Sequence, residues 1–215
     1  RPVVIGERLN PTGKPKLKEA LREKNLSYLY REGIAQAEHG ANILDVNVGL
    51  PGIDEPDMMQ QVVSGLQGIL DLPLQIDTAD PVAMERALRI YNGKPLLNSV
   101  NGKEQSMSTV LPLAKKYGAA VIALTLDENG IPDTPEGRFS IAKRIVERAE
   151  AMGIAKKNII VDPLAMTIST GPKNALVTLE TLRMIRQKLG VHTSLGISNI
   201  SFGLPERDGI NAIFF

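Results

Sequence analysis

Residues 72–79 read LPLQIDTA, and this stretch decides the fold. A few apolar residues typical of a short buried strand are followed by Asp77, a carboxylate placed where the strand should end. Asp80 and Pro81 come next, as expected for the N-cap and the first turn of a helix. The stretch therefore predicts a βα unit whose strand ends in a polar side chain.

The same design recurs along the chain. Apolar residues lead into Asp, Asn or Glu in five further runs: VVIGERLN at 3–10, NILDVNVG at 42–49, PLLNSVNG at 95–102, NIIVDPLA at 158–165 and TSLGISNIS at 193–201. A further strand is expected near 119–126, and the last of these runs belongs to a strand near 191–198, so the predicted strands number seven. Helical spacing of apolar residues separates the strands, at 16–39, 55–70, from 81 onward, 106–117, 135–152, 174–189 and from about 207. Several of these helices should stop at a glycine: Gly40, Gly118, Gly153 and Gly190.

Alternating strands and helices predict an α/β fold with a parallel sheet. Polar strand ends on nearly every strand favour a (β/α)8 TIM-type barrel, which gathers all its strand ends into one mouth. An open doubly wound sheet, with a single switch point, is the alternative. We expect one domain over residues 1–215, with the last strand and helix of the barrel lying beyond residue 215.

Composition narrows the classes of function. The formal net charge is +1, with no basic stripe, so nucleic acid is not expected as a partner. No apolar run approaches the roughly 20 residues of a membrane span, so no membrane is expected either. The absence of Cys excludes disulfides and thiolate metal sites in this chain and fits a reducing, cytoplasmic compartment. His39 and His192 lack metal-ligand spacing, so we expect no metal, and neither a P-loop nor a GxSxG motif is present.

Two carboxylates and two amides are the main candidate site residues. Asp77 and Asp162 each follow apolar residues and could accept paired N–H groups from a guanidine-like edge; the alternative is a helix N-cap. Asn98 and Asn199 offer a donor and an acceptor together, suited to a mixed ring edge; the alternative is a turn. A mouth of this kind fits a flat heterocycle better than a metal or a nucleophile.

Four further polar residues are open between two interpretations. Asp45 and Asn47 occupy alternate positions, so both should face the same side of a strand. They could line the mouth, or form a buried network that only satisfies backbone groups. Glu7 and Asn10, in GERLNPTG, are equally open.

These motifs, in this order, resemble the pterin-binding barrel of methyltetrahydrofolate:corrinoid methyltransferases, which is also the folate domain of cobalamin-dependent methionine synthase. The resemblance covers nearly the whole chain through IGERLNPTG at 5–13, EHGANILDVNVG at 38–49, QIDTAD at 75–80, LLNSVNG at 96–102, IVDPL at 160–164 and LGISNISFGLPER at 195–207. Residues 202–205 look more like the methionine-synthase branch, and TLDENGIP at 125–132 looks like the acetogen branch. The subfamily is therefore open.

The resemblance implies roles for individual residues. Asp77, Asn98 and Asp162 match positions that hydrogen-bond the pterin ring, and Asn199 matches the amide that approaches N5, the nitrogen that carries the methyl group. Gly196 and Ser198 line the same strand end as Asn199. The remaining mouth residues match less certain positions: Glu7, Asn10, Asp45 and Asn47.

The resemblance also implies a reaction and a partner. The reaction is methyl transfer between N5 of tetrahydrofolate and the cobalt of a corrinoid, with tetrahydrofolate or 5-methyltetrahydrofolate as substrate. The chain contains no Asp-x-His-x-x-Gly corrinoid loop and no Cys cluster for zinc-activated homocysteine. Cobalamin should therefore be carried by a partner protein or domain, and a homodimer is implied by the resemblance alone.

Two other functions remain open. Dihydropteroate synthase belongs to the same superfamily, but the first loop, LNPTGKPK, and the amide Asn199 at the seventh strand both favour the methyltransferase. A non-catalytic module that only binds folate within a larger machine is the rival from another class.

Overall fold

The computed structural model describes residues 2–215, which fall into two compact units. The first unit runs to Ser99 and includes 116–120; the second comprises 100–115 and 121–215. Within these residues, no helix is both long and apolar enough to span a bilayer.

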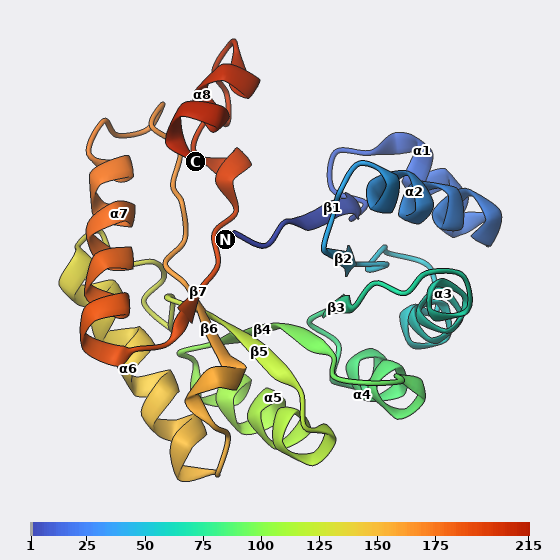
Figure 1. The fold of residues 1–215 in the computed structure, drawn as a ribbon, viewed down its shortest axis with the longest axis horizontal. Helices are drawn as coiled ribbons and strands as arrows, with labels where there is room; N and C mark the ends of the chain where they lie inside the picture. The colour runs from blue at the N-terminus through green and yellow to red at the C-terminus, as the bar shows by residue number, and fades with distance from the viewer. Residues whose placement is uncertain (1) are drawn as a thin grey trace. The chain divides into compact units, whose positions relative to one another are not determined.

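The first unit is built on parallel strands that pair in sequence order. The strands are β1 (Ile5–Leu9), β2 (Ile43–Val46), β3 (Leu74–Asp77) and the start of β4 (Leu96–Asn101). The connecting helices are α1 (Pro15–Arg22), α2 (Leu26–Glu38), α3 (Glu55–Ile69) and α4 (Pro81–Ile90), coloured blue to green in Figure 1. Leu44, Leu74, Ile76 and Leu97 are fully buried, as parallel strands require.

The second unit repeats this arrangement. Its strands β5 (Ala120–Leu124), β6 (Ile159–Asp162) and β7 (His192–Thr193) also pair in parallel and in sequence order. Its helices are α6 (Pro135–Ala151), α7 (Asn174–Met184) and α8 (Arg207–Phe214), and α5 (Glu104–Tyr117) supplies its first residues. The predicted α/β class with parallel strands is therefore confirmed.

Most predicted boundaries hold. Asp80 caps α4, since its carboxylate accepts from the backbone N–H of Val82 at 2.8 Å. The four predicted glycine stops all adopt the left-handed conformation that a helix end requires: Gly40, Gly118, Gly153 and Gly190.

Two boundaries differ from the sequence prediction. The helix expected over 16–39 is two helices, because the Asn25 side chain caps α2 by accepting from Tyr28 N at 3.2 Å. The strand expected over 191–198 is shorter, because the chain leaves β7 after Thr193 and forms a 3₁₀ turn at Ile197–Asn199.

Candidate functional site

In the first unit, a polar cluster lies at the ends of β2 and β3 and reaches Asn98, which lies within β4 and not at its end as the sequence predicted. Asp45 is only 2% exposed, and its Oδ1 accepts from Gln75 Nε2 at 2.5 Å. Asp77, the last residue of β3, accepts from Asn47 Nδ2 at 3.0 Å. The strand register sets Asp77 opposite Asn98. The structure therefore brings together four predicted site residues of this unit.

The two carboxyl groups of the cluster share a buried, acidic environment. Burial raises the pKa of Asp45 to about 8, helped by the negative charges of Asp77 and Glu7 and opposed by hydrogen bonds from Gln75 and Asn98. Burial also raises the pKa of Asp77, while hydrogen bonds from Asn47 and Asp45 act in the opposite direction. Both carboxyl groups are therefore harder to ionise than a free Asp, and each makes ionisation of the other less favourable.

Glu7 lies in the middle of β1 and Asn10 directly follows that strand, both in a more exposed setting. Asn10 Oδ1 accepts from Thr12 N at 3.0 Å, which is the turn geometry given above as the alternative for asparagine. Lys14 Nζ donates to the backbone carbonyls of Glu7 at 3.0 Å and Asn10 at 2.9 Å. These contacts shape the first loop, and the charge of Glu7 acts on both buried carboxyl groups.

The raised pKa of Asp45 predicts a pH-dependent stability difference. Between the pKa of an unfolded Asp, near 3.8, and the folded value of about 8, the folded protein binds more protons than the unfolded chain. Its free energy of unfolding therefore loses up to about 1.4 kcal/mol per pH unit over this window from Asp45 alone. We expect Asp45→Asn to remove this loss, so that the variant gains stability relative to the parent as pH rises from 4 to 8.

Urea unfolding of both proteins at pH 4, 6 and 8 measures the effect. Asp71→Asn, at an exposed position, is the matched control and should follow the parent at each pH. Parallel profiles for Asp45→Asn and the parent would show that Asp45 does not hold the proton.

In the second unit, Asp162 ends β6 in a tight turn. Its Oδ1 accepts from the backbone N–H of Leu164 at 2.7 Å, and Leu164 has the left-handed φ of 63°. Burial raises the pKa of Asp162 to about 6, opposed by the Leu164 hydrogen bond. The next helix starts only at Asn174, so Asp162 is not a helix cap. Its alternative interpretation is therefore wrong.

Asn199 ends the 3₁₀ turn that follows β7. A β-carbon on Gly196 would lie 3.0 Å from Asn199 Nδ2, so glycine at this position leaves the space that the amide occupies. Ser198 contributes its backbone carbonyl, which accepts from Arg207 Nη2 at 2.8 Å. The convergence of this group with the cluster of the first unit stays a prediction.

Sequence reasoning missed two residues around these groups. Gln75 holds the Asp45 carboxyl, and its polar side chain inside an apolar strand was the available signal. Arg138 is fully buried in α6 and bonds the carbonyls that follow Asp162, but a charged residue in a helix gives no such signal.

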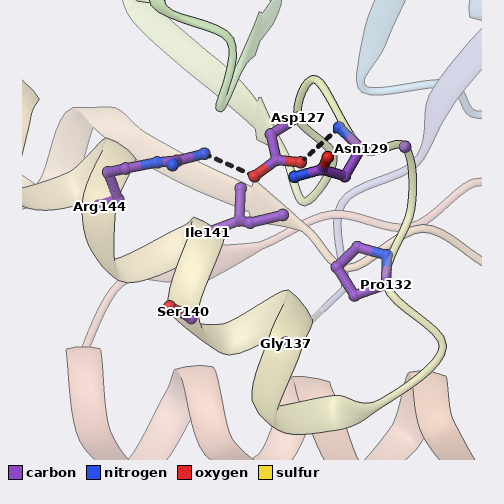
Figure 2. Close-up of a pocket in the computed structure, with 8 residues that line it drawn as sticks. Asp127, Asn129, Pro132, Gly137, Ser140, Ile141 and Arg144 are labelled. Atoms are coloured by element: carbon purple, nitrogen blue, oxygen red, sulfur yellow. Dashed lines mark hydrogen bonds and ion pairs between the residues drawn. The ribbon is translucent and has the colours of Figure 1, made fainter.

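The described chain also contains a surface cavity of about 340 Å³ beside the loop between β5 and α6. Figure 2 shows its polar residues: Asp127 accepts from Arg144 Nη2 and from Asn129 N. These groups already bond one another, and none of the predicted site residues lines the cavity. Across residues 2–215, no three His, Cys, Asp or Glu side chains are grouped to hold a metal ion.

Comparison with known proteins identifies the family. The sequence profile described as "Pterin binding enzyme" matches residues 6–214. The chain belongs to the pterin-binding enzyme family. The resemblance inferred from the strand-end motifs is thereby confirmed.

Three relatives of known activity are similar in sequence along nearly the whole chain. The chain is 33% identical to the methylcorrinoid:tetrahydrofolate methyltransferase of Eubacterium limosum, over 99% of this chain and 79% of that protein. It is 32% identical to the methionine synthase of Mycobacterium tuberculosis and 31% identical to that of Mycobacterium leprae. Both matches cover 99% of this chain but only 19% of the methionine synthase.

Solved structures of the pterin-binding family share the fold. Dihydropteroate synthase from Clostridium difficile, solved in the presence of pteroic acid, superposes with a TM-score of 0.73 at 22% identity, covering 100% of this chain and 85% of that one. The enzyme from Anaplasma phagocytophilum with bound 6-hydroxymethylpterin-monophosphate gives 0.72 at 20% identity, covering 99% and 87%. At these identities the likeness carries the fold alone.

Proposed function

We propose that this pterin-binding enzyme is a methyltransferase that moves a methyl group between N5 of tetrahydrofolate and the cobalt of a corrinoid. The observation that carries the proposal is the 33% identity to a methylcorrinoid:tetrahydrofolate methyltransferase along 99% of the chain. The corrinoid is carried by a partner protein or domain and supplies the cobalt that accepts or donates the methyl group.

The proposed substrate contacts come from the strand ends. Asp77, Asn98 and Asp162 accept hydrogen bonds from, or donate them to, the polar edge of the pterin. Two observations support this use of the carboxylates: Asp162 is not a helix cap, and Asp77 already accepts from an amide N–H, that of Asn47, at 3.0 Å. The remaining residues line the site: Glu7, Asn10, Asp45, Asn47, Gly196 and Ser198.

Asn199 is the proposed catalytic residue. An amine is a poor leaving group unless its nitrogen gains positive charge, so the enzyme must favour a protonated or hydrogen-bonded N5 as the C–N bond breaks. An amide does not titrate in the working range of pH, so Asn199 hydrogen-bonds N5 as its charge changes, and the proton arrives through water. The carboxylates hold the ring so that the methyl group points toward the partner.

The architecture and assembly follow the same proposal. We infer a barrel of the (β/α)8 type, with residues 1–215 as one pterin-binding domain; the seven parallel strands of the described residues and the fold of dihydropteroate synthase support it. A homodimer and a cytoplasmic location stay predictions.

Dihydropteroate synthase activity is the second candidate, favoured by the solved structures that share the fold. Identity favours the methyltransferase, because the chain is 33% identical to that enzyme but only 19–22% identical to the dihydropteroate synthases. A module that binds folate without catalysis is the third candidate.

One pair of assays separates the three candidates. We expect the purified protein to convert Co(I) cobalamin to methylcobalamin with 5-methyltetrahydrofolate, followed by visible absorbance. We expect no product from a pterin pyrophosphate and p-aminobenzoate. The opposite pattern would establish a dihydropteroate synthase, and folate binding without either reaction would establish a binding module.

A further inference from the structure

Arg138 is the largest side chain buried in the described protein. It lies in the first turn of α6 and is only 2% exposed. Burying a guanidinium is costly unless its N–H groups are hydrogen-bonded. Burial lowers its pKa, opposed by the charge of Asp133, but an arginine remains protonated in proteins. A charge in such a position calls for a reason beyond packing.

The Arg138 guanidinium bonds backbone carbonyls and no carboxylate in the described chain. Its Nη1 donates to the backbone carbonyls of Pro163 at 3.0 Å and Leu164 at 2.7 Å. Its Nε donates to the backbone carbonyl of Pro132 at 2.8 Å. The planar fork of an arginine can reach several fixed acceptors at once, which a lysine cannot do. Two of these three acceptors immediately follow Asp162.

The backbone that Arg138 grips is the turn that aims Asp162. Leu164 N donates to Asp162 Oδ1, so the position of the carboxylate depends on the position of the Leu164 peptide. The backbone of Leu164 is in the left-handed region, which a leucine adopts only when the surrounding structure imposes it. Its carbonyl receives the guanidinium and also the Thr178 hydroxyl, at 3.3 Å.

We propose that Arg138 is a positioning residue, which clamps the Asp162–Pro163–Leu164 turn and thereby sets the direction in which Asp162 presents its carboxylate to the pterin. The clamp itself follows from this unit alone, whereas the pterin role rests on the proposed function. Arg138 touches no substrate in this scheme and acts only through Asp162.

Two variants and a matched control test the clamp. Arg138→Met keeps most of the volume and removes every donor, and Arg138→Lys keeps the charge but loses the fork. Arg144→Met is the control, since Arg144 lies on the same helix. Its side chain donates to the Gly102 carbonyl and to Asp127 (Figure 2), and to no residue of the turn at 162–164. Urea unfolding and a folded NMR spectrum establish that each variant is native.

The first readout is the titration of Asp162, followed by carbon-13 NMR of its carboxyl group. Loss of the clamp should release the Leu164 N–H from Asp162, so the pKa of Asp162 should shift upward from about 6 in Arg138→Met. Arg144→Met should titrate like the parent. An unshifted Asp162 in folded Arg138→Met overturns the proposal. If that variant does not fold, Arg138→Lys decides by the same criterion.

The second readout is binding of 5-methyltetrahydrofolate by calorimetry. We expect Arg138→Met to weaken binding by about 10-fold, the effect of losing one well-placed hydrogen bond. In an Asp162→Asn background the same substitution should change the Kd less than twofold, because the two residues act as a unit. Additive effects would overturn the role through Asp162. If Asp162→Asn alone binds like the parent, the pterin role of Asp162 fails, and the NMR titration still decides the clamp.

Discussion

Replacing Asn199 with alanine should lower the rate of methyl transfer by about 100- to 1,000-fold, as loss of one preorganised donor does at oxyanion sites. The Kd for 5-methyltetrahydrofolate should change far less, because the amide acts on a charge that develops only as the C–N bond breaks. Stopped-flow transfer from saturating 5-methyltetrahydrofolate to Co(I) cobalamin measures the rate, and calorimetry measures the Kd.

The control for this prediction is Asn129→Ala, since Asn129 lies in the loop after β5 and lines the separate surface cavity. That variant should transfer methyl at the parent rate. If Asn199→Ala also reaches the parent rate when saturated, Asn199 contributes binding at most, and another group must stabilise the charge that develops at N5.

The second large effect concerns substrate affinity. Asp162→Asn keeps the shape of the side chain and an oxygen for the Leu164 N–H, but it removes the negative charge. Loss of a charged hydrogen bond costs roughly 1.5–3 kcal/mol, so the Kd for 5-methyltetrahydrofolate should rise by about 10- to 150-fold. Calorimetry at pH 7.5 on a variant with native stability is the measurement.

The pH profile gives this second prediction an independent check. Because the pKa of Asp162 is about 6, parent binding should weaken as pH falls through 6 and the carboxylate takes up a proton. Asp162→Asn should lack this step, and Asp127→Asn, in the neighbouring loop, should retain it. Unchanged affinity and an unchanged profile in Asp162→Asn would mean that the pterin is held elsewhere.

Local signals predicted most of the fold. Strand and helix order followed from apolar runs that end in polar residues, and glycines such as Gly118 and Gly190 marked helix ends because their left-handed backbone disfavours other residues. The break before α2 escaped prediction because the four polar residues at 22–25 are compatible with an exposed turn of one long helix as well as with a break between two. The cap competes with the helix through a side-chain hydrogen bond that periodicity does not register.

The residues of the candidate site were also predicted only in part. Asp77 and Asp162 were visible because a carboxylate after an apolar strand stands out in sequence. Gln75 offered a weaker signal, a polar side chain inside an apolar strand, but its contact with Asp45 appears only in the fold. Arg138 offered none, because its importance lies in its contact with the Leu164 carbonyl. A helix position such as 138 is charged in many proteins, so only its burial in three dimensions distinguishes it.

The Asp45–Asp77 pair implies a conflict between folding and function. Two largely buried carboxyl groups placed side by side lower the stability of the empty protein as pH rises and both ionise, and a chain selected for durability alone would carry amides or aliphatic residues there. A ligand that donates N–H hydrogen bonds to the pair reduces this repulsion. Its binding free energy would therefore include relief of the destabilisation that the empty protein carries. If the proposed pterin binds at this pair, we expect its thermal stabilisation of the protein to grow as pH rises through about 8, where Asp45 loses its proton.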